Sequence, residues 1–120
     1  MKQVEYRLWC NNKKEWEKDE WHLTPNGIII DSNRQIEMKP ESHFLSQFIG
    51  LSDKNGVKIF EGDVVKGTAY EAEIYTGEVA YLDSEASFIM KIIGSKGHFR
   101  LNNQTFQALE VVGHKFENAE

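Results

Sequence analysis

Cysteine, proline and long apolar runs are all scarce in this chain of 120 residues. Cys10 is the only cysteine, which excludes an internal disulfide and a zinc site built on cysteines, and a reducing compartment is expected. The longest apolar runs, such as Ile28-Ile29-Ile30, are much too short for a transmembrane helix. The first residues contain no apolar signal region. We therefore expect a cytoplasmic protein that does not contact a membrane.

Catalytic and metal-binding motifs are also lacking. The sequence contains no nucleophile elbow, phosphate-binding loop or dinucleotide-binding glycine motif. No histidine lies two, three or four residues from another, so a zinc site would need carboxylates from remote strands. Cys10 lies on the apolar face of an alternating segment, which favours a small buried hydrophobic residue over a nucleophile. The sequence thus predicts no enzyme, no cofactor and no metal site.

The formal net charge is −5, and the excess of acids is concentrated in one stretch. Residues 61–85 contain seven acidic residues and a single basic one, Lys66. Proteins that bind nucleic acids usually show the reverse, because neutralising phosphates supplies much of their affinity. The acidic stretch is therefore either a solvated face of the fold or a surface that faces a protein partner.

What is present is a dense pattern of turns between short apolar segments. Asn55-Gly56 follows an apolar segment and precedes another, which is the strongest short signal for a β-hairpin. Glu61-Gly62-Asp63 indicates a second turn, with Asp63 able to cap backbone N–H groups. Gly50 interrupts the first apolar segment and predicts a bulge or a close backbone contact. The residues assigned this structural role are Gly50, Asp53, Asn55, Gly56, Glu61, Gly62 and Asp63.

Alternating apolar residues at strand-like spacing continue along the whole chain, and no segment shows a long helical period. The segment around Cys10 places Trp9 on the opposite face, over a second apolar cluster. Ile36 and Met38 are expected to point the same way from one strand. These patterns predict an all-β fold: a single domain, 1–120, in which residues 47–116 form a small, partly open barrel. Residues 1–46 form an N-terminal β extension and 117–120 a tail.

Exposed aromatic residues offer candidate contacts for a partner. Trp16 lies in a strongly charged segment and is either a lid on the core or a contact residue, since tryptophan is enriched at binding hot spots. The aromatic residues are interleaved with acids, which favours a protein partner over single-stranded nucleic acid. The candidate partner-binding residues are Trp16, Trp21, Glu71, Glu73 and Tyr75.

The central segment, Q-F-I-G-L-S-D-K-N-G-V-K-I-F-E-G-D-V-V-K over residues 47–66, resembles the signature of the YopX family of bacteriophages and prophages. Ile49 stands where that family usually has threonine, and Val64 where it has isoleucine. Arg7-Leu8-Trp9 and the closing segment 110–118 are also similar to the family, whereas residues 67–109 match only loosely. The resemblance implies an all-β domain of the SH3-like barrel type and a phage or prophage origin, and it implies no activity.

Together these observations predict an accessory protein that acts by binding another protein or a second copy of itself, because small barrels have open edges. The alternative is a nucleic-acid-binding SH3-like or OB-like barrel. That alternative requires cations to gather in space against the net charge, and the candidates are Arg34, Lys39, Lys91, Lys96 and Arg100.

Overall fold

The computed structural model describes residues 5–69, 73–101 and 107–118. Neither of the short 3-10 helices in this part could cross a membrane, and no longer helix occurs there. All other regular structure in the described residues is β-strand, which confirms the predicted all-β class. The elements are β1 (Tyr6–Cys10), β2 (Glu15–Trp16), β3 (Trp21–Leu23), β4 (Ile29–Asp31), β5 (Ile36–Glu37), β6 (His43–Ser52), β7 (Lys58–Phe60), β8 (Asp63–Ala69), β9 (Glu73–Leu82), η1 (Asp83–Glu85), β10 (Ser87–Ile92), β11 (His98–Arg100), β12 (Gln107–His114) and η2 (Lys115–Asn118).

The chain forms two compact units, and each is built from two separate stretches of sequence. The described residues of the larger unit lie within 5–6 and 47–115, and those of the smaller unit within 7–46 and 116–118. Strand β6 is continuous and contributes its first residues to the smaller unit and its last residues to the larger one.

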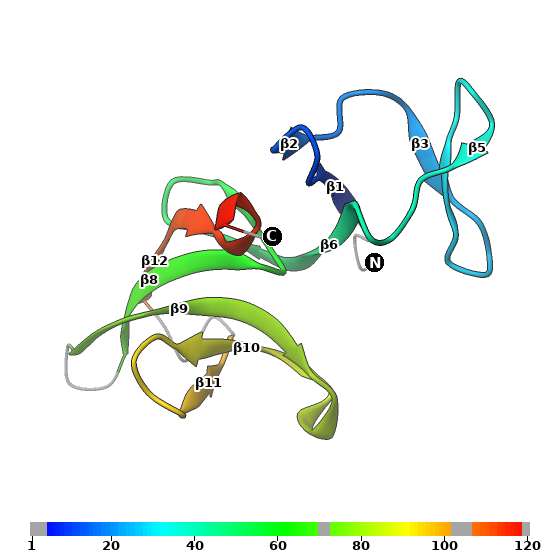
Figure 1. Cartoon of the computed structure of the whole chain (residues 1–120). Helices are drawn as coiled ribbons and strands as arrows, with labels where there is room; N and C mark the ends of the chain where they lie inside the picture. Colours follow the sequence, from blue (N-terminus) through cyan, green and yellow to red (C-terminus); the bar gives the residue numbers. More distant parts are fainter. Residues whose placement is uncertain (1–4, 70–72, 102–106, 119–120) are drawn as a thin grey trace. The chain divides into compact units, whose positions relative to one another are not determined.

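The larger unit contains a curled antiparallel sheet with the order β11-β10-β9-β8-β12 (Figure 1). Its core is formed by one buried residue from each of β8, β9, β10 and β12, together with one residue of β7. This curled, half-closed sheet confirms the expectation of a partly open barrel. The buried core residues are Ile59, Val65, Val79, Met90 and Leu109.

The predicted hairpin joins β6 and β7, which pair antiparallel. Gly56 adopts a φ of 82°, a left-handed conformation that a residue with a Cβ rarely adopts, and its N–H donates to the carbonyl oxygen of Asp53 at 3.0 Å. The register shifts between Phe48 and Ser52, where Gly50 has a φ of 90°. An added Cβ at Gly50 would meet nothing within 4 Å, so of the two expectations for this residue the bulge is the one found.

The carboxylate of Asp53 connects this hairpin to a distant strand. Its Oδ1 accepts hydrogen bonds from the N–H of Asn55 at 2.8 Å and of Val57 at 2.9 Å. Its Oδ2 accepts from the N–H of Val111 in β12 at 3.0 Å. Burial would by itself raise the pKa of Asp53, but the three backbone donors, together with the charge of Lys54, lower it below its ordinary value.

The second predicted turn is organised in the same way. Gly62 has a φ of 92°, and the buried Asp63 accepts a hydrogen bond from the N–H of Phe60 at 2.8 Å. Asp63 therefore caps the end of β7, as the sequence predicted.

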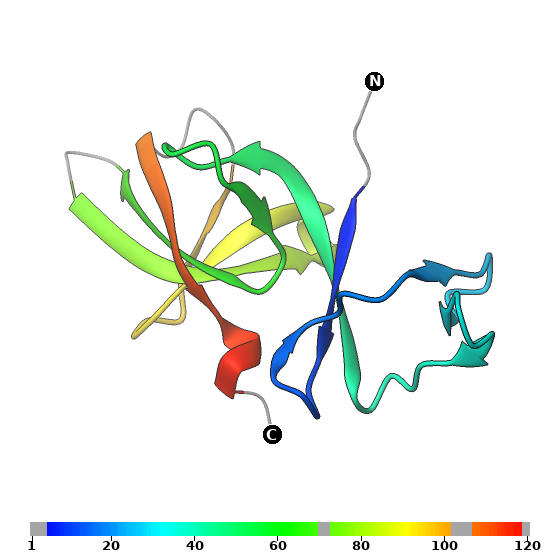
Figure 2. The ribbon, with the colours of Figure 1, turned by 90° about the horizontal axis from the view of Figure 1, so that it is seen from above.

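The smaller unit contains the three-stranded sheet β3-β4-β5, which Figure 2 shows beyond the paired strands β1 and β2. Its apolar cluster consists of Leu8, Ile29 and Met38. The expectation that Ile36 and Met38 point the same way from one strand was wrong, because Met38 lies beyond the end of the strand and is buried, whereas Ile36 is 52% exposed. Strand β5 ends at Glu37, and the N–H of Met38 donates to the carbonyl oxygen of Ile29, so alternation does not continue across this point.

A substitution of Asp53 tests the three hydrogen bonds that its carboxylate accepts from backbone N–H groups. We expect Asp53→Ala to lower the free energy of unfolding by about 2–4 kcal/mol, because it removes the acceptor of three backbone donors. Urea unfolding measures this loss. Asp83→Asn, at an exposed position, serves as the control and is expected to change stability by less than about 0.5 kcal/mol.

The same carboxylate predicts a pH dependence. The pKa of Asp53 is lower in the folded state than in the unfolded state. The ionised carboxylate therefore stabilises the fold fully at pH values above its unfolded-state pKa of about 3.9, and this stabilisation is lost as the pH falls through the folded-state pKa. Urea unfolding of wild type and Asp53→Asn over this acidic range should show a shallower decline for the variant. Equal slopes would contradict the assignment.

Gly77 provides a second test of the curled sheet. An added Cβ would overlap the carbonyl oxygen of Lys91 and the side chain of Met90 on the neighbouring strand. We expect Gly77→Ala to destabilise the protein by about 1–3 kcal/mol through this overpacking, measured by thermal or urea unfolding. Gly113→Ala is the matched control, because a Cβ there meets nothing within 4 Å.

Candidate functional site

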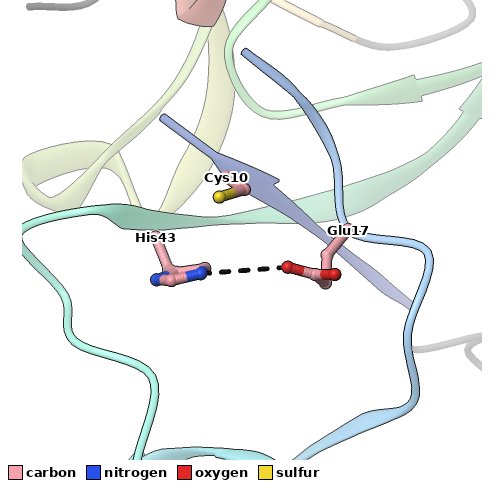
Figure 3. Close-up of side chains that lie close together, drawn as sticks. All are labelled: Cys10, Glu17 and His43. Atoms are coloured by element: carbon pink, nitrogen blue, oxygen red, sulfur yellow. Dashed lines mark ion pairs between the residues drawn. The ribbon is translucent and has the colours of Figure 1, made fainter. Parts of the chain in front are cut away.

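Three side chains of the smaller unit that could ligate a metal ion converge from strands or strand ends. Cys10 is the last residue of β1, Glu17 directly follows β2, and His43 is the first residue of β6 (Figure 3). Their positions are fixed by the backbone: the N–H of Glu17 donates to the carbonyl oxygen of Leu8 at 2.7 Å. The antiparallel pairing of β1 and β2 therefore places Glu17 beside Leu8, two residues before Cys10 and on the same face of β1.

The distances within this Cys10–Glu17–His43 cluster are short. The Cys10 Sγ, a carboxylate oxygen of Glu17 and a ring nitrogen of His43 lie within 4.8 Å of one another. The His43 Nε2 is 3.8 Å from the Glu17 Oε2, and the exposed fractions of these two side chains are only 15% and 6%. A thiolate, an imidazole and a carboxylate are all ligands of divalent transition metals.

A cavity of about 310 Å³ opens onto the cluster. Its lining includes all three residues and the charged side chains of Asp19, Arg34 and Lys39. Two of the cations proposed for nucleic-acid binding, Arg34 and Lys39, are therefore found here, in the smaller unit. Sequence reasoning assigned Cys10 and His43 no shared role, because they are far apart in the chain and are joined by no short motif.

The larger unit has a groove of about 490 Å³ on β9, β10 and the turn into β11. Lys91 and His98 are direct partners across β10 and β11, which places both side chains on the same face. Among the described residues, neither Lys91 nor Lys96 forms an ion pair, and the residue opposite Lys91 across β9 and β10 is Glu78. We call this the β9–β11 groove; its apolar lining includes Leu82, Ile89 and Ile92, and its polar lining includes Lys91, Lys96 and His98.

Glu85 neutralises part of the charge next to this groove. Its carboxylate accepts hydrogen bonds from the Arg100 Nε at 2.8 Å and lies 2.7 Å from the His98 Nε2. The hydrogen bonds from Arg100 and His98 hold the pKa of Glu85 below its ordinary value. Another acid of the 61–85 stretch, Glu78, lies 3.6 Å from the Lys115 Nζ. The acidic stretch is thus partly neutralised by cations from later in the chain.

The candidate aromatic residues lie in different clusters. Trp16 is half-buried and packs edge-on against Trp9, with ring centroids 5.0 Å apart, and against Phe116 at 5.7 Å. The guanidinium of Arg7 lies 3.9 Å from the centre of the Trp16 ring. Trp9 therefore does cover a second apolar cluster, and Trp16 has the position expected of its lid.

The remaining candidates divide between the two units. Trp21 packs against the cluster around Leu8 in the smaller unit. Tyr75, in the larger unit, packs edge-on against Phe99 and donates a hydrogen bond to the Glu73 Oε2 at 2.6 Å. That hydrogen bond to Glu73 is the main reason why the pKa of Tyr75 is raised. Glu71 lies outside the described residues.

Comparison with known proteins places the chain among relatives of the same fold. A family model described as YopX protein matches residues 5–120. The chain belongs to the YopX family. A search of curated protein sequences returned no match.

Two solved structures of similar fold span nearly the whole chain. Protein EF1440 from Enterococcus faecalis has a TM-score of 0.63 and 23% identity, with 98% of this chain and 96% of that chain covered. The protein yopX from Bacillus subtilis has a TM-score of 0.61 and 16% identity, with the same coverage of both chains. At these identities the likeness shows the shared fold.

The resemblance to the YopX family was based on the central segment, residues 47–66. In this chain, residues of that segment form turns. Asp53, Gly56, Gly62 and Asp63 form the two turns described above. The candidate sites lie elsewhere, on the Cys10–Glu17–His43 cluster and in the β9–β11 groove. The most recognisable residues of the family resemblance therefore specify the fold.

Replacing Trp16 tests its role as a lid. We expect Trp16→Ala to destabilise the protein by about 2–3 kcal/mol, somewhat less than a fully buried tryptophan, because the ring contacts Trp9, Phe116 and Arg7. Near-ultraviolet circular dichroism should also lose intensity from the coupled tryptophans. Trp16→Phe is expected to retain most of the stability. An unchanged unfolding midpoint in Trp16→Ala would instead favour a contact role.

Proposed function

We propose that this YopX-family protein acts by binding a protein partner, and that the partner docks in the β9–β11 groove. The observation that supports the proposal is the composition of the groove, in which an apolar floor lies beside Lys91 and Lys96, two exposed cations that form no ion pair among the described residues. Apolar contacts supply most of the binding energy in such sites, and charges at the rim set specificity and the rate of association.

The chemistry of the groove defines the partner. The half-buried Leu82 and Ile92 offer surface to aliphatic side chains. Lys91 and Lys96 favour a partner with acidic side chains over one with basic side chains. We therefore propose an extended protein segment that carries aliphatic residues next to Asp or Glu. The volume, about 490 Å³, is enough for a few side chains of such a segment.

The wider role that we propose is that of a phage or prophage accessory protein in the bacterial cytoplasm, without enzymatic activity. The resemblance of residues 47–66 to the family signature and the lack of catalytic sequence motifs support this role. Self-association is the other form of protein binding consistent with a sheet that ends in the short strand β11.

Single-stranded nucleic acid is the second candidate, and one observation favours it. Tyr81 is 44% exposed and lines the same groove as Lys91 and Lys96. The ring packs against Phe88 and could stack a base, and the ammonium groups of Lys91 and Lys96 could contact phosphates. Arg100 lies on the adjacent strand β11, so part of the predicted set of cations is gathered in this region.

A peptide-display selection with the full-length protein tests the docking proposal. We expect the enriched peptides to combine aliphatic residues with Asp or Glu. Their affinity, measured by fluorescence anisotropy, should fall at least about tenfold in Lys91→Glu/Lys96→Glu, because two favourable charges become repulsive. Lys13→Glu/Lys18→Glu makes the same change in net charge at exposed positions of the smaller unit and should leave binding intact.

Binding of fluorescein-labelled oligo(dT) and oligo(U) tests the alternative of single-stranded nucleic acid. Salt-sensitive binding of an oligonucleotide that is lost in Lys91→Glu/Lys96→Glu would replace the protein partner with nucleic acid. Peptide binding that is unaffected by the double substitution would reject the groove as the docking site.

A further inference from the structure

We propose that Cys10, Glu17 and His43 form a binding site for one divalent transition-metal ion, with Zn²⁺ as the preferred ion. The donor set is one thiol sulfur, one imidazole nitrogen and one carboxylate oxygen. A thiolate ligand selects soft or borderline ions over Mg²⁺ and Ca²⁺, which prefer sites made of oxygen ligands.

The spacing of the donors fits a tetrahedral ion. Typical bonds to Zn²⁺ are about 2.0–2.3 Å long, so tetrahedral ligand atoms lie about 3.3–3.8 Å apart. The Nε2 of His43 and the Oε2 of Glu17 are 3.8 Å apart, and all three donor atoms lie within 4.8 Å of one another. A side-chain adjustment of about 1 Å or less therefore completes the ligand geometry without moving the strands.

The environment of the His43 ring also fits a ligand. Its Nδ1 is 3.0 Å from the Ser42 Oγ and 3.4 Å from the carbonyl oxygen of Lys39. Histidine ligands usually donate their second N–H to a carbonyl or carboxylate, which fixes the ring and leaves the other nitrogen for the metal. These contacts leave Nε2, the nitrogen that faces Glu17, as the donor atom.

The same contacts count against a nucleophile activated by His43. A triad requires the thiol and the carboxylate to occupy opposite ring nitrogens, so that the acid orients the base. Here Ser42 and Lys39 occupy the vicinity of Nδ1, and Glu17 faces Nε2. The arrangement therefore matches three ligands around a shared point better than a relay from acid to base to thiol.

The backbone holds the three donors in place before an ion binds. Cys10 is paired with Glu15 across β1 and β2, and the N–H of Asn11 donates to the carbonyl oxygen of Ser42 at 2.8 Å. These bonds place Cys10 beside the two segments that carry Glu17 and His43. A largely preformed site binds an ion without ordering a flexible loop.

Three protein ligands leave one tetrahedral position open. In this structure the cavity of about 310 Å³ adjoins the cluster, so water or an anionic group can fill that position. The cavity is lined by cations such as Lys39 and Arg34 and also by acids such as Asp19 and Glu37, so its charges are mixed. The site is therefore predicted to bind an exogenous ligand on the metal as well as the metal itself.

Titration of the reduced, metal-free protein with Co²⁺ and Zn²⁺ tests the proposal. We expect one ion per chain by isothermal titration calorimetry. Co²⁺ should produce a thiolate-to-metal charge-transfer band in the near ultraviolet and intense visible bands typical of tetrahedral coordination, and Zn²⁺ should displace it. Cys10→Ser, Glu17→Gln and His43→Gln should each weaken binding by more than about 100-fold, beyond the effect typical of losing an outer-shell contact.

His22→Gln is the matched control, because His22 is an exposed histidine of the same unit outside this cavity. It should bind Zn²⁺ with wild-type affinity. Loss of binding in His22→Gln equal to that in His43→Gln would overturn the assignment, as would a Co²⁺ complex without the thiolate band.

A second measurement uses only the wild-type protein, so it stands even if a variant fails to fold. Zn²⁺ at one equivalent should slow the reaction of Cys10 with a thiol reagent at least about tenfold and raise the melting temperature, because the ion binds the folded state. Equal rates with and without Zn²⁺ would reject Cys10 as a ligand. Mg²⁺ at the same concentration should have no effect.

Discussion

The carboxylate of Asp53 is the contact on which the larger unit most depends. It accepts N–H groups from its own turn and from Val111, which is far away in the sequence. The first set shapes the hairpin, and the second attaches that hairpin to β12 at the end of the sheet order. A locally encoded turn thereby decides where a distant strand lies. A neutral or shorter side chain would leave backbone donors without their acceptor in a largely dry environment.

Features encoded locally could be predicted from the sequence, and features that depend on distant pairing could not. Asn55-Gly56 and Gly62 adopt the turns that their conformational preferences favour, and alternating residues predicted the all-β fold and its curled sheet. The contact between Asp53 and Val111 joins residues 58 positions apart, so no short pattern reveals it. At Ile36 the local pattern was present but misleading, because the alternation of apolar residues continues in the sequence beyond the end of the strand.

Neither candidate site could be predicted from local sequence patterns, and the reason is the same for both. Cys10, Glu17 and His43 converge only because β1 and β2 form a pair and β6 begins beside them. Lys91 and His98 share a face only because β10 and β11 pair in one register. In each case the chemistry is a property of strand pairing. The acidic charge of residues 61–85 is likewise partly neutralised by Arg100 in β11 and by Lys115 in η2.

The division of the chain into two units has a consequence for inheritance. Each unit is assembled from two separated stretches of sequence, and β6 passes without a break from one to the other. A genetic crossover at a single point would therefore give a hybrid in which at least one unit combines pieces of different parents. The two units are therefore expected to be exchanged between genomes together, as one continuous gene segment.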